Sequence, residues 1–169
     1  LTKKTPSHRS LVSARYMGKS TILTALASRM PEAGMPYITV IKWDLRHKTP
    51  RTDEEFLQTL AQKMAEGLMD AGEADYGEHL SKVQSDFNAE IASILDMLAA
   101  EEKRILMLWD GFDKPLTAGT LTRNLWDNLR ELCLKSSLRL VTATRRNLRE
   151  LIRDEKSVTS DFWNIFGDC

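Results

Sequence analysis

The sequence predicts an α/β fold in which a mostly parallel β-sheet lies between two layers of helices, a three-layer α-β-α arrangement. Short runs rich in apolar and β-branched residues alternate along the chain with longer segments whose apolar residues recur at helical spacing. Strands that alternate with helices form parallel sheets covered on both faces, because each connecting helix packs back onto the sheet. The 169 residues suffice for a single domain with a sizeable core.

The first half of the chain is predicted to contain two strands, each followed by a helix. In order, these are a strand at 9–12 (RSLV), a helix at 19–30, a strand at 36–45 (PYITVIKWDL) and a helix that begins near residue 53. Thr52 or Asp53 is expected to cap the last of these helices, since Glu55 stands three residues after Thr52.

The second half continues the same alternation. Its predicted elements are a helix at 78–102, a strand at 104–109 (RILMLW), a helix at 119–135, a strand at 138–144 (LRLVTAT) and a helix at 147–155. The strand at 104–109 is apolar throughout almost its whole length, which is typical of a strand buried on both faces. The helix at 78–102 is expected to pack its apolar stripe against the sheet, and a subunit interface is the alternative.

Residues 13–20 (SARYMGKS) have the pattern of a phosphate-binding loop whose first glycine is replaced by Ser13. The predicted strand before the loop and helix after it are the context that such a loop requires. In this pattern Gly18 lets the backbone approach a phosphate, while Lys19 reaches the terminal phosphates. The alternative is that the glycine and serine merely begin a helix. The residues predicted to bind the nucleotide are Ser13, Arg15, Met17, Gly18, Lys19, Ser20 and Thr21.

Two carboxylates follow the strand at 104–109. Asp110 stands directly after the apolar run, and Asp113 lies three residues further on. Magnesium prefers oxygen ligands, so Ser20 and Asp110 are predicted to hold a Mg²⁺ ion. Asp113 is predicted to position or deprotonate the attacking water. A strand-end cap and an ordinary turn residue are the alternative interpretations of these two aspartates.

The strand at 138–144 ends in a polar sequence, TATRR. Thr144 or Arg145 should therefore emerge at the same edge of the sheet as Gly18 and Asp110. An arginine at this place can contact the γ-phosphate and stabilise charge during phosphoryl transfer, so Arg145 is predicted to be catalytic. The alternative is an arginine that is simply solvated.

Together these stretches resemble the additional-strand class of P-loop NTPases, and within it the STAND ATPases, relatives of AAA+ proteins that include the NACHT family. SLVSARYMGKSTIL is similar to Walker A, RILMLWDGFDK to Walker B and LRLVTATR to the sensor 1 strand. Lys114 stands where NACHT proteins usually have a second acidic residue. The tail TSDFWNIF resembles the segment that leads to the last core strand of the family.

The resemblance implies that the strand after the Walker B strand inserts between it and the phosphate-loop strand. It also implies an ATP-binding, slowly hydrolysing switch that couples the Mg-ATP state to self-association or to a fused effector or sensor domain. The helical lid and winged-helix domains of the family would follow residue 169, so the chain is expected to be a fragment of a longer protein. The Asn-Lys-x-Asp guanine signature is absent, which favours ATP.

Three alternatives remain on the sequence alone: a degenerate P-loop domain that acts as a protein-interaction module, a DNA-associated AAA+ ATPase, and another ATP enzyme such as a nucleotide kinase. The 24 basic and 24 acidic residues cancel, so nucleic acid and membrane partners are not indicated. Two cysteines are too few for a disulfide framework, which favours the cytoplasm. No apolar run reaches the roughly 18 residues of a membrane span.

Overall fold

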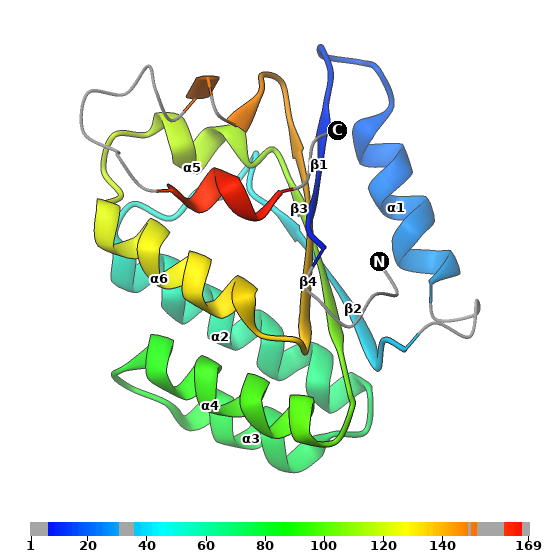
Figure 1. Cartoon of the computed structure of the whole chain (residues 1–169), viewed down its shortest axis with the longest axis vertical. Coiled ribbons are helices and arrows are strands. Elements are labelled where there is room, and N and C mark those ends of the chain that lie inside the picture. Colours follow the sequence, from blue (N-terminus) through cyan, green and yellow to red (C-terminus); the bar gives the residue numbers. More distant parts are fainter. Residues whose placement is uncertain (1–6, 31–35, 149, 152–160, 167–169) are drawn as a thin grey trace.

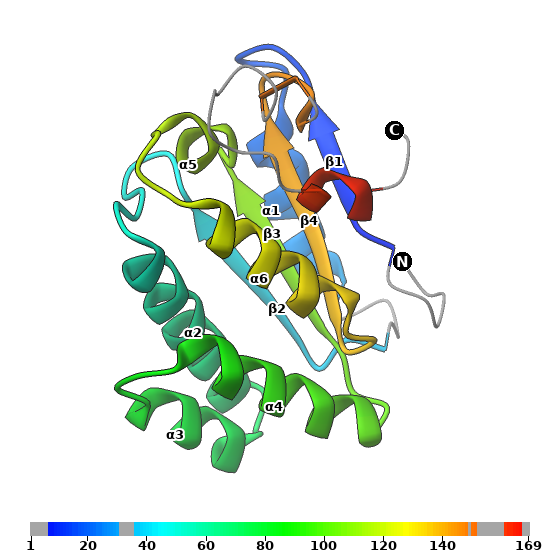
Figure 2. The ribbon, with the colours of Figure 1, turned by 60° about the vertical axis from the view of Figure 1, so that its left-hand side comes forward.

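The computed structural model describes residues 7–30, 36–148, 150–151 and 161–166. Four strands form one sheet: β1 (Arg9–Val12), β2 (Thr39–Asp44), β3 (Ile105–Asp110) and β4 (Leu138–Thr144). Helix α1 (Lys19–Arg29) covers one face, and the remaining long helices cover the other (Figures 1 and 2). The predicted three-layer α/β fold is therefore confirmed. Among the described residues, no helix combines the length and the apolar character that crossing a membrane requires.

The strand order β1-β4-β3-β2 places β4 between β3 and β1, which confirms the insertion that the family resemblance implies. β4 pairs in parallel with β1 on one side and with β3 on the other. Phe166 adds a parallel bridge to His8. The tail that resembles the approach to a last core strand thus meets the sheet beside the start of β1.

The helix that follows β2 begins at the predicted cap. α2 (Asp53–Asp70) starts after Thr52, whose side chain accepts a hydrogen bond from the Glu55 amide at 3.1 Å. Glu55 Oε2 in turn accepts from the Arg51 amide at 2.7 Å. The first bond satisfies a backbone donor that the first turn of a helix cannot pair internally, and the second ties the residue before the cap to the helix.

The predicted continuous helix at 78–102 is wrong, because two helices occupy this region. α3 (Ala74–Lys82) and α4 (Phe87–Ala100) are separated by a short turn in which Val83 is extended and Asp86 has a φ of 53°. The polar run Gln84-Ser85-Asp86 favours a turn over a helix interior. The apolar stripe nevertheless packs in the core, as expected: Leu80, Phe87, Ile91, Ile94 and Leu98 are buried.

The remaining helices differ from the expected ranges at their ends. The residues predicted as one helix at 119–135 form α6 (Arg123–Leu134), and an additional short helix, α5 (Asp113–Thr117), precedes it. A 3₁₀ helix, η1 (Asp161–Ile165), packs near α6. In the predicted helix at 147–155, the described residues Leu148, Glu150 and Leu151 are helical, and residues 149 and 152–155 lie outside the described part.

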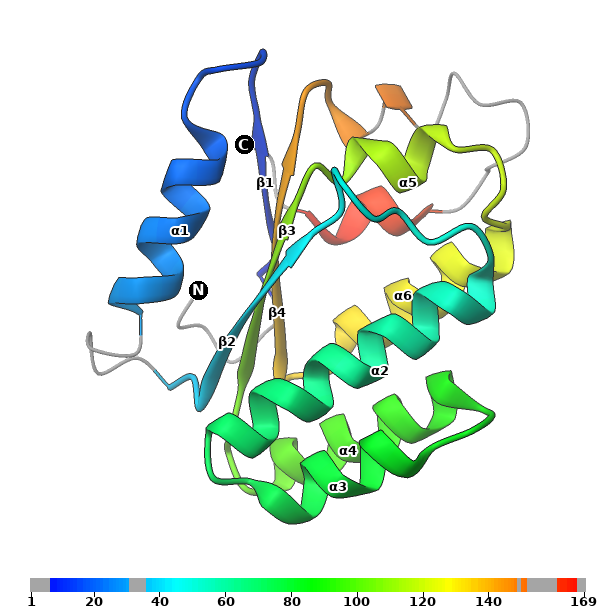
Figure 3. The same cartoon turned by 180° about the vertical axis from the view of Figure 1, so that it is seen from behind.

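β3 is buried on both faces, as its apolar sequence predicts. Its alternate residues Ile105, Met107 and Trp109 belong to the large cluster shared with α2, α4 and α6. Leu106 and Leu108 point to the opposite side and pack in the cluster that contains Leu23 of α1. The side-chain alternation of a strand accounts for this division, and Figure 3 shows the two helical layers on either side of the sheet.

His8, directly before β1, connects the edge of the sheet to α6 and β4 through two hydrogen bonds. The imidazole is 1% exposed. Its Nε2 donates to the Cys133 carbonyl at 2.7 Å, and the Leu140 amide donates to its Nδ1 at 3.0 Å. A backbone N–H on Nδ1 requires that nitrogen to be unprotonated, so the ring is neutral with its proton on Nε2. Burial lowers the His8 pKa from 6.5 to about 4.

We predict that His8 makes the protein sensitive to mild acid. The folded-state pKa lies below the unfolded value of 6.5, so the unfolded chain takes up the proton first. Stability is therefore complete above pH 6.5 and falls progressively as the pH drops toward 4, by about 3 kcal/mol in free energy of unfolding. Urea denaturation between pH 4.5 and 7.5 measures this slope.

His8→Gln should flatten that slope, since the substitute carries no proton in this range. His79→Gln is the matched control, because His79 is half-exposed on α3, where it contacts Glu90. Equal slopes in the His8→Gln variant and the unaltered chain would show that the buried imidazole does not control the acid response.

Candidate nucleotide-binding site

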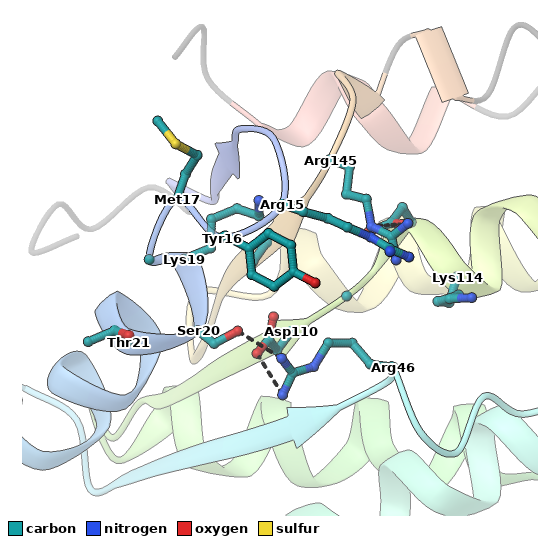
Figure 4. A pocket seen from close by; sticks show the side chains of 14 residues that line it. Arg15, Tyr16, Met17, Lys19, Ser20, Thr21, Arg46, Asp110, Lys114 and Arg145 are labelled. Atoms are coloured by element: carbon teal, nitrogen blue, oxygen red, sulfur yellow. Dashed lines mark hydrogen bonds and ion pairs between the residues drawn. The ribbon is translucent and has the colours of Figure 1, made fainter.

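A cavity of about 560 Å³ lies at the carboxyl edge of the sheet (Figure 4). This size suits a small-molecule ligand. Parallel strands bring their following loops to one edge, where ligands of open α/β sheets bind. Residues 15–21, from the loop after β1 and the first turn of α1, line one side. The rest of the lining comes from the carboxyl ends of β2, β3 and β4 and the segments after them: Arg46, Asp110, Gly111, Asp113, Lys114, Ala143 and Arg145.

The loop between β1 and α1 turns sharply just before the helix. Gly18 has a φ of 79°, a conformation that favours glycine, and its carbonyl accepts the Ile22 amide at 2.9 Å. Lys19 Nζ folds back onto the start of the loop, where it donates to the Ala14 carbonyl at 2.8 Å and to Ser13 Oγ at 3.2 Å. It also donates to the Ser13 carbonyl. The ammonium group is thus held inside the loop by oxygen atoms.

The predicted phosphate-binding residues divide into two groups. Six of them line the cavity: Arg15, Met17, Gly18, Lys19, Ser20 and Thr21. Ser13 does not line it and instead contacts Lys19 as described above, while its amide donates to the Thr144 carbonyl at 3.3 Å. Ser13 therefore joins the loop to β4, and its contribution to a phosphate contact would be indirect, through the position of Lys19.

The two predicted magnesium ligands face one guanidinium group. Asp110 is 2% exposed, and its Oδ2 has no hydrogen-bond partner, although Arg46 Nη2 lies 3.4 Å away. Ser20 Oγ accepts from Arg46 Nη1 at 3.0 Å. A buried carboxylate oxygen that lacks a hydrogen bond, next to a hydroxyl, fits a hard cation with oxygen ligands. The residues present are therefore compatible with Mg²⁺.

The two predicted catalytic residues lie within reach of each other on the cavity wall. Asp113 is the first residue of α5, and its Oδ2 lies 3.4 Å from Arg145 Nε. Both side chains line the cavity, whereas Thr144 is buried and does not. Arg145 is thus the residue of the pair Thr144 and Arg145 that reaches the site. In this conformation the carboxylate and the guanidinium neutralise each other.

Five lining residues were not predicted as site residues: Tyr16, Arg46, Gly111, Lys114 and Ala143. Arg46 follows β2 by two residues, so the rule that parallel strands end at one edge could have placed it. Asp44 holds it through two side-chain bonds, Arg46 Nε to Oδ1 at 2.9 Å and Nη2 to Oδ2 at 2.6 Å. These bonds from Arg46 lower the Asp44 pKa to about 2. Tyr16 sits at the centre of the loop with a φ of 64° and is 98% exposed.

Solved structures of Cdc6 and ORC proteins share this fold. No protein-family model and no curated protein sequence matches the chain. The Cdc6p structure from Pyrobaculum aerophilum has a TM-score of 0.59 at 10% identity, and covers 99% of this chain and 39% of its own. The Aeropyrum pernix ORC2 protein, in ADPNP-ADP complexes, has a TM-score of 0.61 at 12% identity. The match covers 96% of this chain and 40% of the ORC2 chain.

A third structure, the Aeropyrum pernix ORC1 protein in complex with DNA, has a TM-score of 0.57 at 14% identity, with 97% of this chain and 38% of its own covered. The chain thus spans about two fifths of the length of these proteins. The α/β fold is that of the Cdc6 and ORC AAA+ P-loop NTPases. At identities this low, the structural similarity establishes the fold alone, and the STAND assignment stays a proposal.

We predict that replacing two neighbouring loop residues, Tyr16 and Met17, by glycine has opposite effects on stability. The positive φ of Tyr16 costs a side chain about 1–2 kcal/mol, and its exposed ring has little packing to lose. Tyr16→Gly should therefore raise the free energy of unfolding slightly, after an entropic offset of about 0.4–1 kcal/mol.

Met17→Gly is the matched control, because Met17 is also exposed, at 67%, but is not among the residues with a positive φ. It should lower the free energy of unfolding by about 0.5–1 kcal/mol through chain entropy alone. Chemical denaturation of both variants measures the difference, and losses of equal size would contradict the strained conformation of Tyr16.

Proposed function

We propose that this chain is the ATP-binding core of a P-loop switch protein. The observation that supports the proposal most strongly is the convergence of Lys19, Ser20 and the buried carboxylate of Asp110 on one cavity. A loop lysine, a hydroxyl at the start of a helix and a strand-end carboxylate are the groups that bind a magnesium nucleotide in such sites. The fold likeness to Cdc6 and ORC AAA+ ATPases agrees with this function.

Each residue would have a distinct role toward the bound nucleotide. Lys19 and the amides of the loop would contact the β- and γ-phosphates. Ser20 and Asp110 would hold Mg²⁺, which neutralises phosphate charge when bound. Asp113 would orient the attacking water and Arg145 would contact the γ-phosphate. These two residues would have to separate, since they contact each other in the present conformation.

Hydrolysis is proposed for the intact protein, in which further domains would close the cavity. The chain spans about two fifths of the length of the similar structures. Arg145 and Asp113 both lie at the cavity wall, where water screens their interaction with phosphate. A closed lid would strengthen these contacts, and a STAND-like switch would pass the nucleotide state to self-association or to an attached effector.

A DNA-associated AAA+ ATPase is the second candidate. The observation that favours it is the fold likeness to an ORC1 protein that was solved in complex with DNA, whereas the charge balance of the sequence did not indicate a nucleic acid partner. The chain itself carries 24 basic and 24 acidic residues, so a DNA contact would have to use a local patch. Both candidates require the same nucleotide site.

Lys19→Ala should weaken ATP binding by at least about 1.5 kcal/mol, roughly tenfold, because it removes a charge-assisted contact and leaves the loop amides in place. Lys82→Ala is the matched control, since Lys82 ends α3 at the far end of the molecule from the cavity (Figure 1). Calorimetric titration of ATP with Mg²⁺ measures both affinities after equal denaturation midpoints have been verified. Equal affinity of the two variants would remove the phosphate-loop assignment.

A further inference from the structure

The guanidinium of Arg46 lies between the two groups that are predicted to hold magnesium. Arg46 Nη1 donates to Ser20 Oγ at 3.0 Å, and Nη2 lies 3.4 Å from Asp110 Oδ2 (Figure 4). One planar cation therefore contacts oxygen atoms from the start of α1 and from the end of β3. The guanidinium would therefore compete for these oxygens with a metal ion that the same two residues hold.

The position of Arg46 is built into the surrounding structure. Asp44 binds the guanidinium through both carboxylate oxygens, and the Leu45 amide donates to the Asp110 carbonyl at 2.9 Å, which fixes the end of β2 beside β3. Gly111 leaves room for the side chain, since a Cβ at this position would lie 2.2 Å from Arg46 Cγ. The Arg46 side chain is thus held in place by the backbone pairing beside it, by its two bonds to Asp44 and by its close packing against Gly111.

We propose that Arg46 is an internal cation of the nucleotide site, which pairs with Asp110 and Ser20 in the metal-free state and is displaced when Mg²⁺ enters. This inference rests on the proposed nucleotide-binding function and names the residue that sets its metal requirement. Asp110 has only 3% of its side chain exposed, so an unpaired negative charge there is unfavourable and a cation is required in both states.

The proposal gives Arg46 two opposite effects on ligand binding. Without metal, the guanidinium places a positive charge where the phosphates of a nucleotide meet Ser20, so it supports ATP binding. With metal present, the guanidinium competes with Mg²⁺ for Asp110, so it raises the Mg²⁺ concentration needed for half-saturation. Removal of Arg46 should therefore weaken metal-free binding and lower the half-saturating Mg²⁺ concentration together. A residue that only supports the fold would not produce this combination.

The experiment measures binding of a fluorescent N-methylanthraniloyl-ATP by anisotropy, first in EDTA and then across a Mg²⁺ titration at constant ionic strength. Arg46→Ala and Arg46→Gln are compared with the unaltered chain and with Arg51→Ala. Arg51 is an exposed arginine of the same β2–α2 connection, outside the cavity lining. Arg46→Gln keeps most of the side-chain volume, so it separates loss of charge from loss of packing beside Gly111.

Both Arg46 variants should bind about tenfold more weakly in EDTA and should require several-fold less Mg²⁺ for half-saturation, as loss of a charge-assisted contact implies. Arg51→Ala should match the unaltered chain. If both Arg46 variants stay within twofold of Arg51→Ala, or bind more tightly in EDTA, the inference is overturned while Lys19→Ala still reports on the site. If the unaltered chain binds no nucleotide, the proposed function fails and the inference fails with it.

Discussion

The pairing of β4 with both β1 and β3 is the constraint on which the site depends. Its register sets Val12 opposite Thr144 and Ala143 opposite Asp110. All seven residues of β4 are buried, so a shift by one residue would move its whole side-chain pattern to the wrong faces. With the register fixed, the loop after β1, the carboxylate at the end of β3 and Arg145 must emerge at one edge.

Two cations at this edge are held by protein groups in the present conformation. Lys19 is held by oxygen atoms of its own loop, and Arg145 by Asp113. The side chain of Arg145 is 36% exposed, so its ion pair contributes at most about 1 kcal/mol and can be exchanged for a phosphate contact. Asp110 differs because it is almost fully buried, and removal of its cation partner leaves a charge that solvent cannot stabilise.

The sequence predicted the sheet well because its signals there are local and strong. RSLV and LRLVTAT are strands over their predicted residues, and the family resemblance anticipated the inserted position of the latter. The break between α3 and α4 was missed because an apolar stripe continues in phase across Lys82 and Phe87, and a stripe alone does not show where the backbone turns.

The loop, the strand-end aspartates and Arg145 were found because each belongs to a known motif or to a strand end. Arg46 was missed because no motif contains it, although its place two residues after β2 puts it at the same edge of the sheet. Its contacts with Asp44, Asp110 and Ser20 could not be predicted, because they form only in the folded chain. Likewise, the contact between Asp113 and Arg145 joins residues more than thirty positions apart, and no pattern within one segment could indicate it.

Nuclear magnetic resonance mapping of the ATP site tests the central claim most directly, because backbone amide shifts report the location of binding residue by residue. On addition of ATP and Mg²⁺, we expect the largest changes at residues 15–21, 110, 111, 113 and 145, which line the cavity. The amides of α3 and α4, at the other end of the molecule, should not move (Figure 1). Changes centred on α3 and α4, or none at saturating nucleotide, would contradict a nucleotide site at the carboxyl edge of the sheet.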